Sequence, residues 1–293
     1  MRLADLYDGF LIDLDGVVWL GHDLLPGAAS TLTGLMEEGK RVAFVTNSPR
    51  LTPGEHADVL RAGGVPVRDE QMVTAASTLI GMAVERLGAA PRVIAIGTDS
   101  FLAQVDMAGI VRLALDDWKQ AEAVLVSGHI GFNYGELRAA AMAARNGALL
   151  AATGRDPTMP MPDGLWPGTG SVLAAIETAA EVKGFITGKP ERRIFDAGLA
   201  AIGAATTGGG NDKPGEDDPK DGRDGGGVIT DAQSGSPLRM AMIGDRLDTD
   251  VGGGQAAGVD GILVTGGGPA AEHPDITPDH VIESLAGLLN PQG

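Results

Sequence analysis

Short apolar runs alternate with amphipathic stretches along most of the chain. The runs lack the polar alternation of a half-exposed strand, so they are typical of strands that are buried on both faces. They lie at residues 9–12, 42–45, 93–96, 123–126, 148–151, 184–187, 240–243 and 261–264. Between them lie helical patterns such as 134–146 and 171–181, and Ser171 is a candidate N-cap of the second pattern. The alternation predicts βαβ units and mostly parallel sheet covered by helices.

One segment, residues 203–236, departs from this pattern. It contains ten glycines, seven acidic residues and three basic residues, with almost no large apolar side chain. A segment of this composition cannot bury enough surface to offset the conformational entropy lost on ordering it. We therefore expect a long, mobile, Gly/Asp-rich loop here.

The charge and the residue composition exclude several classes of function. The 293-residue chain has 22 Lys and Arg against 39 Asp and Glu, a net charge of −17 at pH 7. It lacks the basic excess on which sequence-independent nucleic-acid binding and attachment to anionic membranes depend. The absence of cysteine excludes disulfides, thiolate catalysis and cysteine-ligated zinc. Because no leader and no apolar stretch of about 18 residues is visible, we expect a cytoplasmic protein without nucleic-acid or membrane partners.

Polar residues follow four of the predicted strands. Asp13 and Asp15 follow the first run, and residues 46–47 (Thr-Asn) follow the second. Lys189 follows the sixth run, and the acidic stretch 245–250 follows the seventh. Ligands of open parallel sheets bind beyond the carboxyl ends of the strands. Each signal is weak alone, but together they predict one site.

These residue types suit phosphoryl transfer. Asp13 can attack phosphorus to give an aspartyl-phosphate, while Asp15 can protonate the leaving oxygen and then deprotonate the hydrolytic water. Attack of an anion on an anion needs compensating positive charge. A Mg²⁺ ion held by Asp13, Asp245 and the main-chain carbonyl of Asp15 would supply that charge.

Four further residues complete the expected site. Lys189 would neutralise phosphate charge and hold Asp13. Thr46 and the backbone of Asn47 would donate hydrogen bonds to phosphoryl oxygens, as helix N-termini do to anions. Asp250 would orient Lys189 or a metal-bound water without itself binding the metal.

The four motifs together resemble those of the haloacid dehalogenase-like (HAD) phosphatases. They stand at residues 13–19, 46–47, 188–190 and 244–250. The last motif is most similar to class IIA, the branch of phosphoglycolate, 4-nitrophenyl phosphate, glycerol-phosphate and sugar or nucleotide phosphatases. The resemblance implies an α/β fold, with a doubly wound, Rossmann-like parallel-sheet core and an α/β cap inserted between the second and third motifs.

The resemblance also implies domain boundaries. We place the core at residues 1–86 and 183–293, and the cap at residues 87–182. The predicted loop at 203–236 then accounts for the long spacing between the third and fourth motifs and need not touch the site.

The cap of such an enzyme would contact the substrate. The resemblance assigns this role to the loop that contains Asp156 and Gly168. Gly154 stands where the family usually has asparagine, and Ser48 replaces the second asparagine of the usual Thr-Asn-Asn motif.

We expect a Mg²⁺-dependent phosphatase that hydrolyses a small phosphorylated metabolite through an aspartyl-phosphate. The chain could dimerise through the cap. One alternative is a receiver-like signalling module that accepts phosphate on aspartate, although such a module lacks a cap and an acid–base residue such as Asp15. Another is a phosphate-binding scaffold without turnover.

Overall fold

The computed structural model describes residues 1–21, 23–161, 163–207 and 227–291. The chain forms two compact units. The first comprises residues 1–46, 53–73 and 189–293, and the second comprises residues 47–52 and 74–188. These limits differ from the domain boundaries predicted from the sequence, because helix α3 (Ala75–Leu87) and strand β12 (Phe185–Ile186) group with the second unit.

The first unit is built on a six-stranded sheet in the order β17-β16-β15-β1-β4-β5. Strand β1 pairs in parallel with both β15 and β4, and β15, β16 and β17 also pair in parallel. The strands are β1 (Gly9–Ile12), β4 (Arg41–Thr46), β5 (Met72–Thr74), β15 (Met240–Gly244), β16 (Asp260–Val264) and β17 (His280–Ile282).

This strand order reverses at β1. Strands β4 and β5 lie on one side of β1, whereas β15, β16 and β17 lie on the other. Ile12, the last residue of β1, is in register with Phe44 of β4 and Ile243 of β15. The carboxyl ends of these three strands therefore meet at a switch point, where doubly wound sheets bind their ligands.

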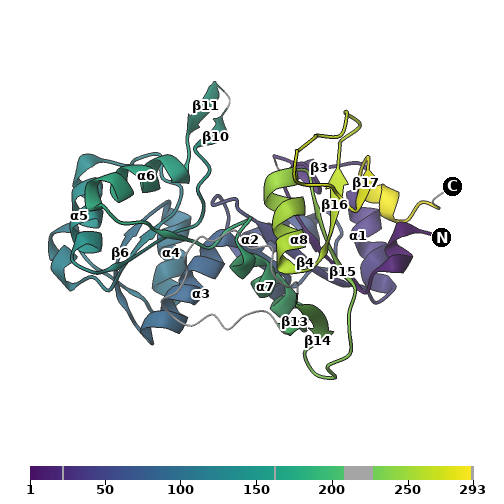
Figure 1. Ribbon diagram of the computed structural model, residues 1–293, viewed down its shortest axis with the longest axis horizontal. Helices are drawn as coiled ribbons and strands as arrows, with labels where there is room; N and C mark the ends of the chain where they lie inside the picture. The colour runs from purple at the N-terminus through teal and green to yellow at the C-terminus, as the bar shows by residue number, and fades with distance from the viewer. Residues whose placement is uncertain (22, 162, 208–226, 292–293) are drawn as a thin grey trace. The chain divides into compact units, whose positions relative to one another are not determined.

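Both faces of this sheet are covered (Figure 1). Phe10 and Ile12 belong to the same buried cluster as Leu32 of α1. Leu11, which alternates with them, faces α7, where a Cβ on Gly198 would lie 3.1 Å from the Leu11 side chain. This two-sided packing is the physical reason for the unbroken apolar runs.

The helices of the first unit are α1 (Ala28–Glu37), α2 (Pro53–Ala62), α7 (Arg192–Ala201) and α8 (Gly253–Ala257). The unit also contains 3-10 turns at Leu3–Leu6, Asp69–Gln71 and Leu285–Leu288 and a π-helical turn at Leu247–Gly252.

The second unit contains a five-stranded sheet in the order β12-β9-β8-β6-β7, with every neighbouring pair parallel. Its other strands are β6 (Arg92–Ile96), β7 (Val111–Arg112), β8 (Ala123–Val126) and β9 (Leu149–Ala152), and a separate hairpin joins β10 (Thr158–Met161) to β11 (Gly164–Pro167). Its helices are α3, α4 (Asp99–Met107), α5 (Tyr134–Arg145) and α6 (Thr169–Ala180), with a 3-10 helix at Leu115–Gln120.

All eight apolar runs form strands of the two parallel sheets, so the predicted α/β fold class is confirmed. The predicted N-cap of the second helical pattern is wrong. Helix α6 begins two residues before Ser171, with Gly168 as its N-cap. The Ser171 hydroxyl instead donates a hydrogen bond to the carbonyl of Pro157 at 2.7 Å, and so ties α6 to the loop before β10.

Part of the predicted loop at 203–236 is regular structure. Strands β13 (Ala204–Thr207) and β14 (Val228–Asp231) form an antiparallel pair. These two short segments are rich in β-branched residues, which favour strands. The average composition of the long segment concealed this local preference. Residues 208–226 lie outside the described residues.

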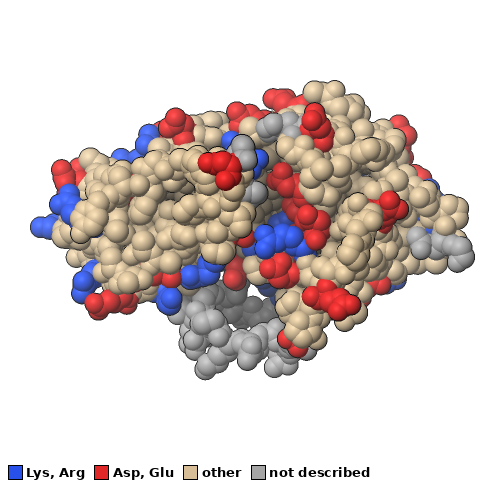
Figure 2. All heavy atoms as spheres, turned by 90° about the horizontal axis from the view of Figure 1, so that it is seen from above, with Lys and Arg blue, Asp and Glu red and all other residues tan. Residues whose placement is uncertain are grey.

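No helix in the described part of the chain is long and apolar enough to cross a membrane. On the face drawn in Figure 2, Lys and Arg side chains stand in small groups among Asp and Glu side chains. This face therefore carries charged side chains of both signs.

A buried carboxylate fastens the loop after β9 to helix α6. Glu177 of α6, whose side chain is only 6% exposed, accepts hydrogen bonds from Arg155 at 2.8 and 3.1 Å. Its Oε1 also accepts the backbone N–H of Gly184 at 2.8 Å, and Lys183 approaches Oε2 at 3.3 Å. Burial acts to raise the pKa of Glu177, but these donors outweigh it and hold the pKa at about 2.

We predict that Glu177→Gln lowers the free energy of unfolding at neutral pH by about 1–3 kcal/mol, because Arg155 and the Gly184 N–H lose a charged acceptor. The folded pKa of about 2 lies below the ordinary value of 4.5, so this stabilisation is complete above that ordinary value. It is lost as the pH falls toward the folded pKa. Urea denaturation should show the difference between wild type and variant shrinking from neutral pH to about pH 3.

Glu181→Gln provides the matched control, because the Glu181 side chain is 75% exposed and lies 3.7 Å from Arg145. It should change the free energy of unfolding by less than about 0.5 kcal/mol. A Glu177→Gln effect that does not depend on pH would contradict the electrostatic explanation.

Candidate active site

Three carboxylates converge at the switch point of the first unit. Asp13 directly follows β1, and its backbone N–H donates to the carbonyl of Ile243 in β15 at 2.8 Å. Asp245 directly follows β15, and Asp250 lies in the π-helical turn after it. One oxygen atom from each of Asp13, Asp245 and Asp250 lies within 4.8 Å of the others. The strand-end pattern had predicted this convergence.

Lys189 joins two of these carboxylates. Its Nζ lies 2.7 Å from Oδ1 of Asp13 and 2.6 Å from Oδ1 of Asp250. The side chains are 4%, 10% and 0% exposed, respectively, so the three charges are almost completely removed from water. The second oxygen of Asp250 accepts the backbone N–H of Arg246 at 3.1 Å. Asp250 therefore has a partner at each oxygen, an ion pair with Lys189 at Oδ1 and a hydrogen bond from Arg246 at Oδ2.

Burial and charge shift the pKa values of this cluster. Burial raises the pKa of Asp13 above its ordinary range, the Lys189 ammonium opposes that rise, and Asp250 adds to it. For Lys189, burial acts to lower the pKa, but Asp13 and Asp250 outweigh it and keep the pKa above its ordinary value. The pKa of Asp245 is raised by burial and by Asp250. Three carboxylates face one ammonium, so the cluster favours additional positive charge.

Two glycines make room for these carboxylates. Gly16 has a φ of +81°, and a Cβ at this position would lie 2.3 Å from Oδ2 of Asp245. Gly244 ends β15, and its Cβ would lie 2.2 Å from Cβ of Asp250. Any side chain at either position would displace a carboxylate of the cluster. In the sequence, Gly16 and Gly244 belong to the first and fourth motifs, but nothing there indicates that they make room for carboxylates.

The first unit also contains Asp15 and Thr46. Asp15 has a contact with Trp19 that the sequence did not predict. Thr46 is buried at the carboxyl end of β4, beside β1. Asp15 is exposed, and its Oδ1 accepts a hydrogen bond from the Trp19 indole at 3.3 Å. The sequence placed Trp19 in the first motif but gave no signal of this partner.

The remaining predicted residues belong to the second unit. Asn47 lies close to Gly188, where a Cβ would be 2.5 Å from Asn47 Oδ1. Gly168 packs against the 156–158 segment, because a Cβ there would lie 2.5 Å from the carbonyl oxygen of Asp156. A Cβ on Gly154 would lie 3.1 Å from Oδ2 of Asp156. These small residues therefore determine how closely the Asp156 loop packs.

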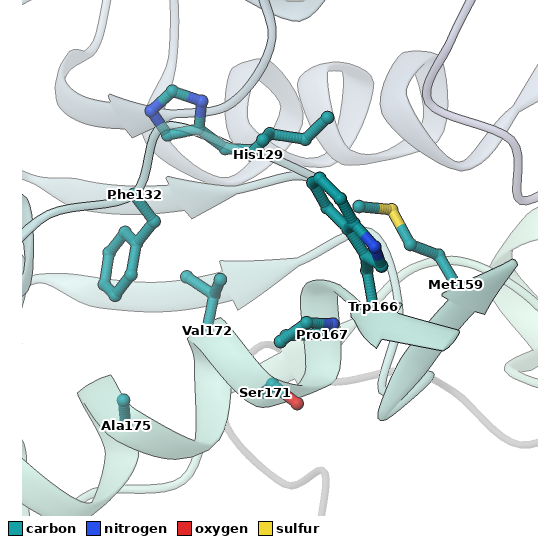
Figure 3. Close-up of a pocket in the computed structure, with 9 residues that line it drawn as sticks. His129, Phe132, Met159, Trp166, Pro167, Ser171, Val172 and Ala175 are labelled. Atoms are coloured by element: carbon teal, nitrogen blue, oxygen red, sulfur yellow. The ribbon is translucent and has the colours of Figure 1, made fainter. Parts of the chain in front are cut away.

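A hollow of about 340 Å³ lies beside the β10–β11 hairpin of the second unit. In Figure 3, Trp166 and Met159 of the hairpin stand opposite Phe132 and His129, which follow β8. The Nε2 atom of His129 lies 3.2 Å from Oε1 of Glu136. The lining also includes Ile130, Pro167, Ser171, Val172 and Ala175, so the hollow is mainly apolar.

Comparisons with known proteins agree with this geometry. Family models for haloacid dehalogenase-like hydrolases and HAD-hydrolase-like domains match residues 10–111 and 186–288. Chronophin of Rattus norvegicus is 32% identical over 97% of this chain and 88% of its own length. Glycerol-3-phosphate phosphatase of Gallus gallus is 30% identical, covering 96% of this chain and 91% of its own.

Solved structures extend the likeness to the whole fold. Glycerol phosphate phosphatase of Mycobacterium tuberculosis in complex with magnesium matches with a TM-score of 0.77 at 27% identity, covering 98% of this chain and 78% of that chain. A structure of the same protein in complex with calcium matches with a TM-score of 0.76. From its motifs, its site and these relatives, the chain belongs to the haloacid dehalogenase-like hydrolases, within the class IIA phosphatases.

Proposed function

We propose that the protein is a Mg²⁺-dependent phosphatase that hydrolyses a small-molecule phosphomonoester through an aspartyl-phosphate on Asp13. The observation that carries this proposal is the buried contact between Asp13 and Lys189 inside the carboxylate cluster. A carboxylate at the end of a central strand, oriented by a buried ammonium, is suited to nucleophilic attack.

Asp13 and Lys189 have complementary roles in this reaction. The Asp13 carboxylate attacks phosphorus, the bond from phosphorus to the leaving oxygen breaks, and its electron pair remains on that oxygen. The Lys189 ammonium offsets the negative charge that gathers around phosphorus. Asp250 forms an ion pair with the same Nζ at 2.6 Å and keeps the ammonium in place.

Asp15 is the proposed acid–base residue. It protonates the leaving oxygen in the first step and takes a proton from water in the second, when water attacks the aspartyl-phosphate. Asp15 is exposed, unlike Asp13, so substrate and water can reach it. This residue separates the proposal from a receiver-like module, which would keep its phosphate, and from a scaffold without turnover.

The residues of the cluster fit a hard divalent cation. Asp13 and Asp245 each offer an oxygen to the cluster, and Mg²⁺ prefers oxygen ligands of this kind. We assign the ion to Asp13, Asp245 and the main-chain carbonyl of Asp15. Asp250 has a supporting role, because both of its oxygens are engaged by Lys189 and Arg246. When bound, the ion supplies positive charge that makes attack of one anion on another possible.

The substrate class rests on the relatives and on the second unit. Relatives are named for glycerol phosphate and phosphoglycolate, and we extend this class to sugar phosphates and nucleotides. Thr46 and the Asn47 backbone are proposed to bind the phosphate, and Asp156 and Gly168 to shape the contact with the leaving group. Exposed apolar side chains at Ile130, Tyr134 and Leu165 support dimerisation through the second unit.

We predict that Asp13→Asn lowers kcat for 4-nitrophenyl phosphate by at least about a thousandfold, because the amide cannot form the aspartyl-phosphate. EDTA should abolish wild-type turnover, and added Mg²⁺ should restore it. Asp116→Asn is the control, because Asp116 is 91% exposed on the second unit. Mg²⁺-dependent hydrolysis by the Asp13→Asn protein would refute the nucleophile assignment.

We predict that Asp15→Asn impairs the enzyme according to the basicity of the leaving group. With phenyl phosphate, whose leaving group needs a proton, kcat/KM should fall by roughly a hundredfold or more. With 4-nitrophenyl phosphate the loss should be about tenfold smaller. Steady-state kinetics on both substrates provide the measurement, and equal losses would argue against the acid role.

We predict that Gly16→Ala weakens Mg²⁺ binding, measured by titration calorimetry, by at least about tenfold, because the new methyl group collides with Asp245. Gly21→Ala is the matched control, because Gly21 also has a positive φ, of +68°, but a Cβ there would meet nothing within 4 Å. Both variants should lose about 1 kcal/mol of stability to backbone strain. Equal Mg²⁺ affinities in the two variants would remove Asp245 from the metal site.

A further inference from the structure

The Trp19 indole is fixed firmly in the first unit. Trp19 is 1% exposed and lies in the same buried cluster as Phe10 and Phe44. Its ring stacks on His56 of α2, with centroids 5.7 Å apart and planes inclined by 12°, and His56 is 2% exposed. An indole packed in this way has little freedom to turn.

The backbone holds Trp19 at a fixed distance from Asp15. The Gly16 N–H donates to the Trp19 carbonyl at 2.8 Å, and the Trp19 N–H donates to the Leu14 carbonyl at 3.2 Å. This tight turn places the buried indole against the exposed carboxylate, where Nε1 donates to Oδ1 of Asp15 at 3.3 Å. Among the described residues, only Trp19 donates a hydrogen bond to this carboxylate.

The hydrogen bond from the Trp19 indole affects which oxygen of Asp15 carries the proton in the acid form. An indole N–H can donate a hydrogen bond but cannot accept one. The oxygen it faces, Oδ1 of Asp15, therefore acts as the acceptor in this contact. A carbonyl oxygen accepts a hydrogen bond more strongly than the hydroxyl oxygen of a carboxylic acid, so the contact favours the acid form whose proton is on Oδ2.

We propose that Trp19 is a positioning residue that orients the Asp15 carboxyl group and directs proton transfer through Oδ2. This inference rests on the proposed role of Asp15 as acid and base. In the first step the leaving oxygen keeps the electron pair of the broken bond to phosphorus and receives the proton of Oδ2. In the second step water attacks phosphorus, the electron pair returns to Asp13, and the water proton passes to Oδ2.

Trp19→Phe tests this role, because phenylalanine keeps an aromatic ring against His56 but removes the N–H. The readout is kcat/KM, which covers the steps through release of the leaving group, for phenyl phosphate and 4-nitrophenyl phosphate. We expect a loss of about tenfold for phenyl phosphate and of about twofold or less for 4-nitrophenyl phosphate. Trp118→Phe, at a half-buried tryptophan of the second unit, is the matched control and should change neither value.

A second measurement separates positioning from general structural damage. In an Asp15→Asn background, Trp19→Phe should cause no further loss with either substrate, because the residue through which it acts is already disabled. If Trp19→Phe does not fold, 3-benzothienylalanine at position 19 keeps the bicyclic shape and replaces the N–H by sulfur.

Two outcomes would overturn the inference: equal losses with both substrates, or a further loss in the Asp15→Asn background. Either result would mean that the contact only satisfies a buried indole. Failure of the proposed function looks different, because the wild type would then lack Mg²⁺-dependent turnover or would keep it after Asp13→Asn.

Discussion

The first unit is organised around a buried ammonium. Lys189 lies between Asp13 and Asp250, with its side chain 4% exposed. A charge this deeply buried is tolerated only when it is paired and hydrogen-bonded, and removal of one partner typically costs about 3–5 kcal/mol. The chain must therefore bring the end of β1 and the turn after β15 to the start of α7. The parallel order of β4, β1 and β15 does this, because it places their carboxyl ends at one edge.

The same neighbourhood contains two kinds of aspartate. Asp13 is buried and bound to an ammonium, whereas Asp15, two residues later, is exposed and meets a neutral indole. The turn between β1 and Trp19 creates this difference within a few residues. Gly16 lies in that turn and has no side chain, so Asp245 can approach it closely. One short segment thus provides both the carboxylate that we propose attacks phosphorus and the one that we propose transfers a proton.

The sequence could predict the strands and their convergence, because both depend on local periodicity and on a general rule about strand ends. It therefore predicted that Asp13, Lys189, Asp245 and Asp250 lie together, although their catalytic roles stay predictions. It could not predict that Trp19 meets Asp15 and His56, since that contact depends on the turn and on a helix far along the chain. The N-cap of α6 was missed because the backbone conformation at Gly168 cannot be seen in the hydrophobic pattern. The β13–β14 pair was missed because the composition was averaged over the whole of residues 203–236, which concealed two short β-branched segments.

The β13–β14 pair is connected to the central sheet at one of its ends. Thr207 and Val228 are paired at its open end, and the Thr207 hydroxyl donates to the Val228 carbonyl at 3.0 Å. At the other end, Arg41 of the central sheet forms an ion pair with Asp231 and donates to the Gly203 carbonyl at 2.8 Å. Because Arg41 belongs to β4, this end of the β13–β14 pair is tied to the central sheet through both of its strands, so a change in the position of β4 would be transmitted to the pair.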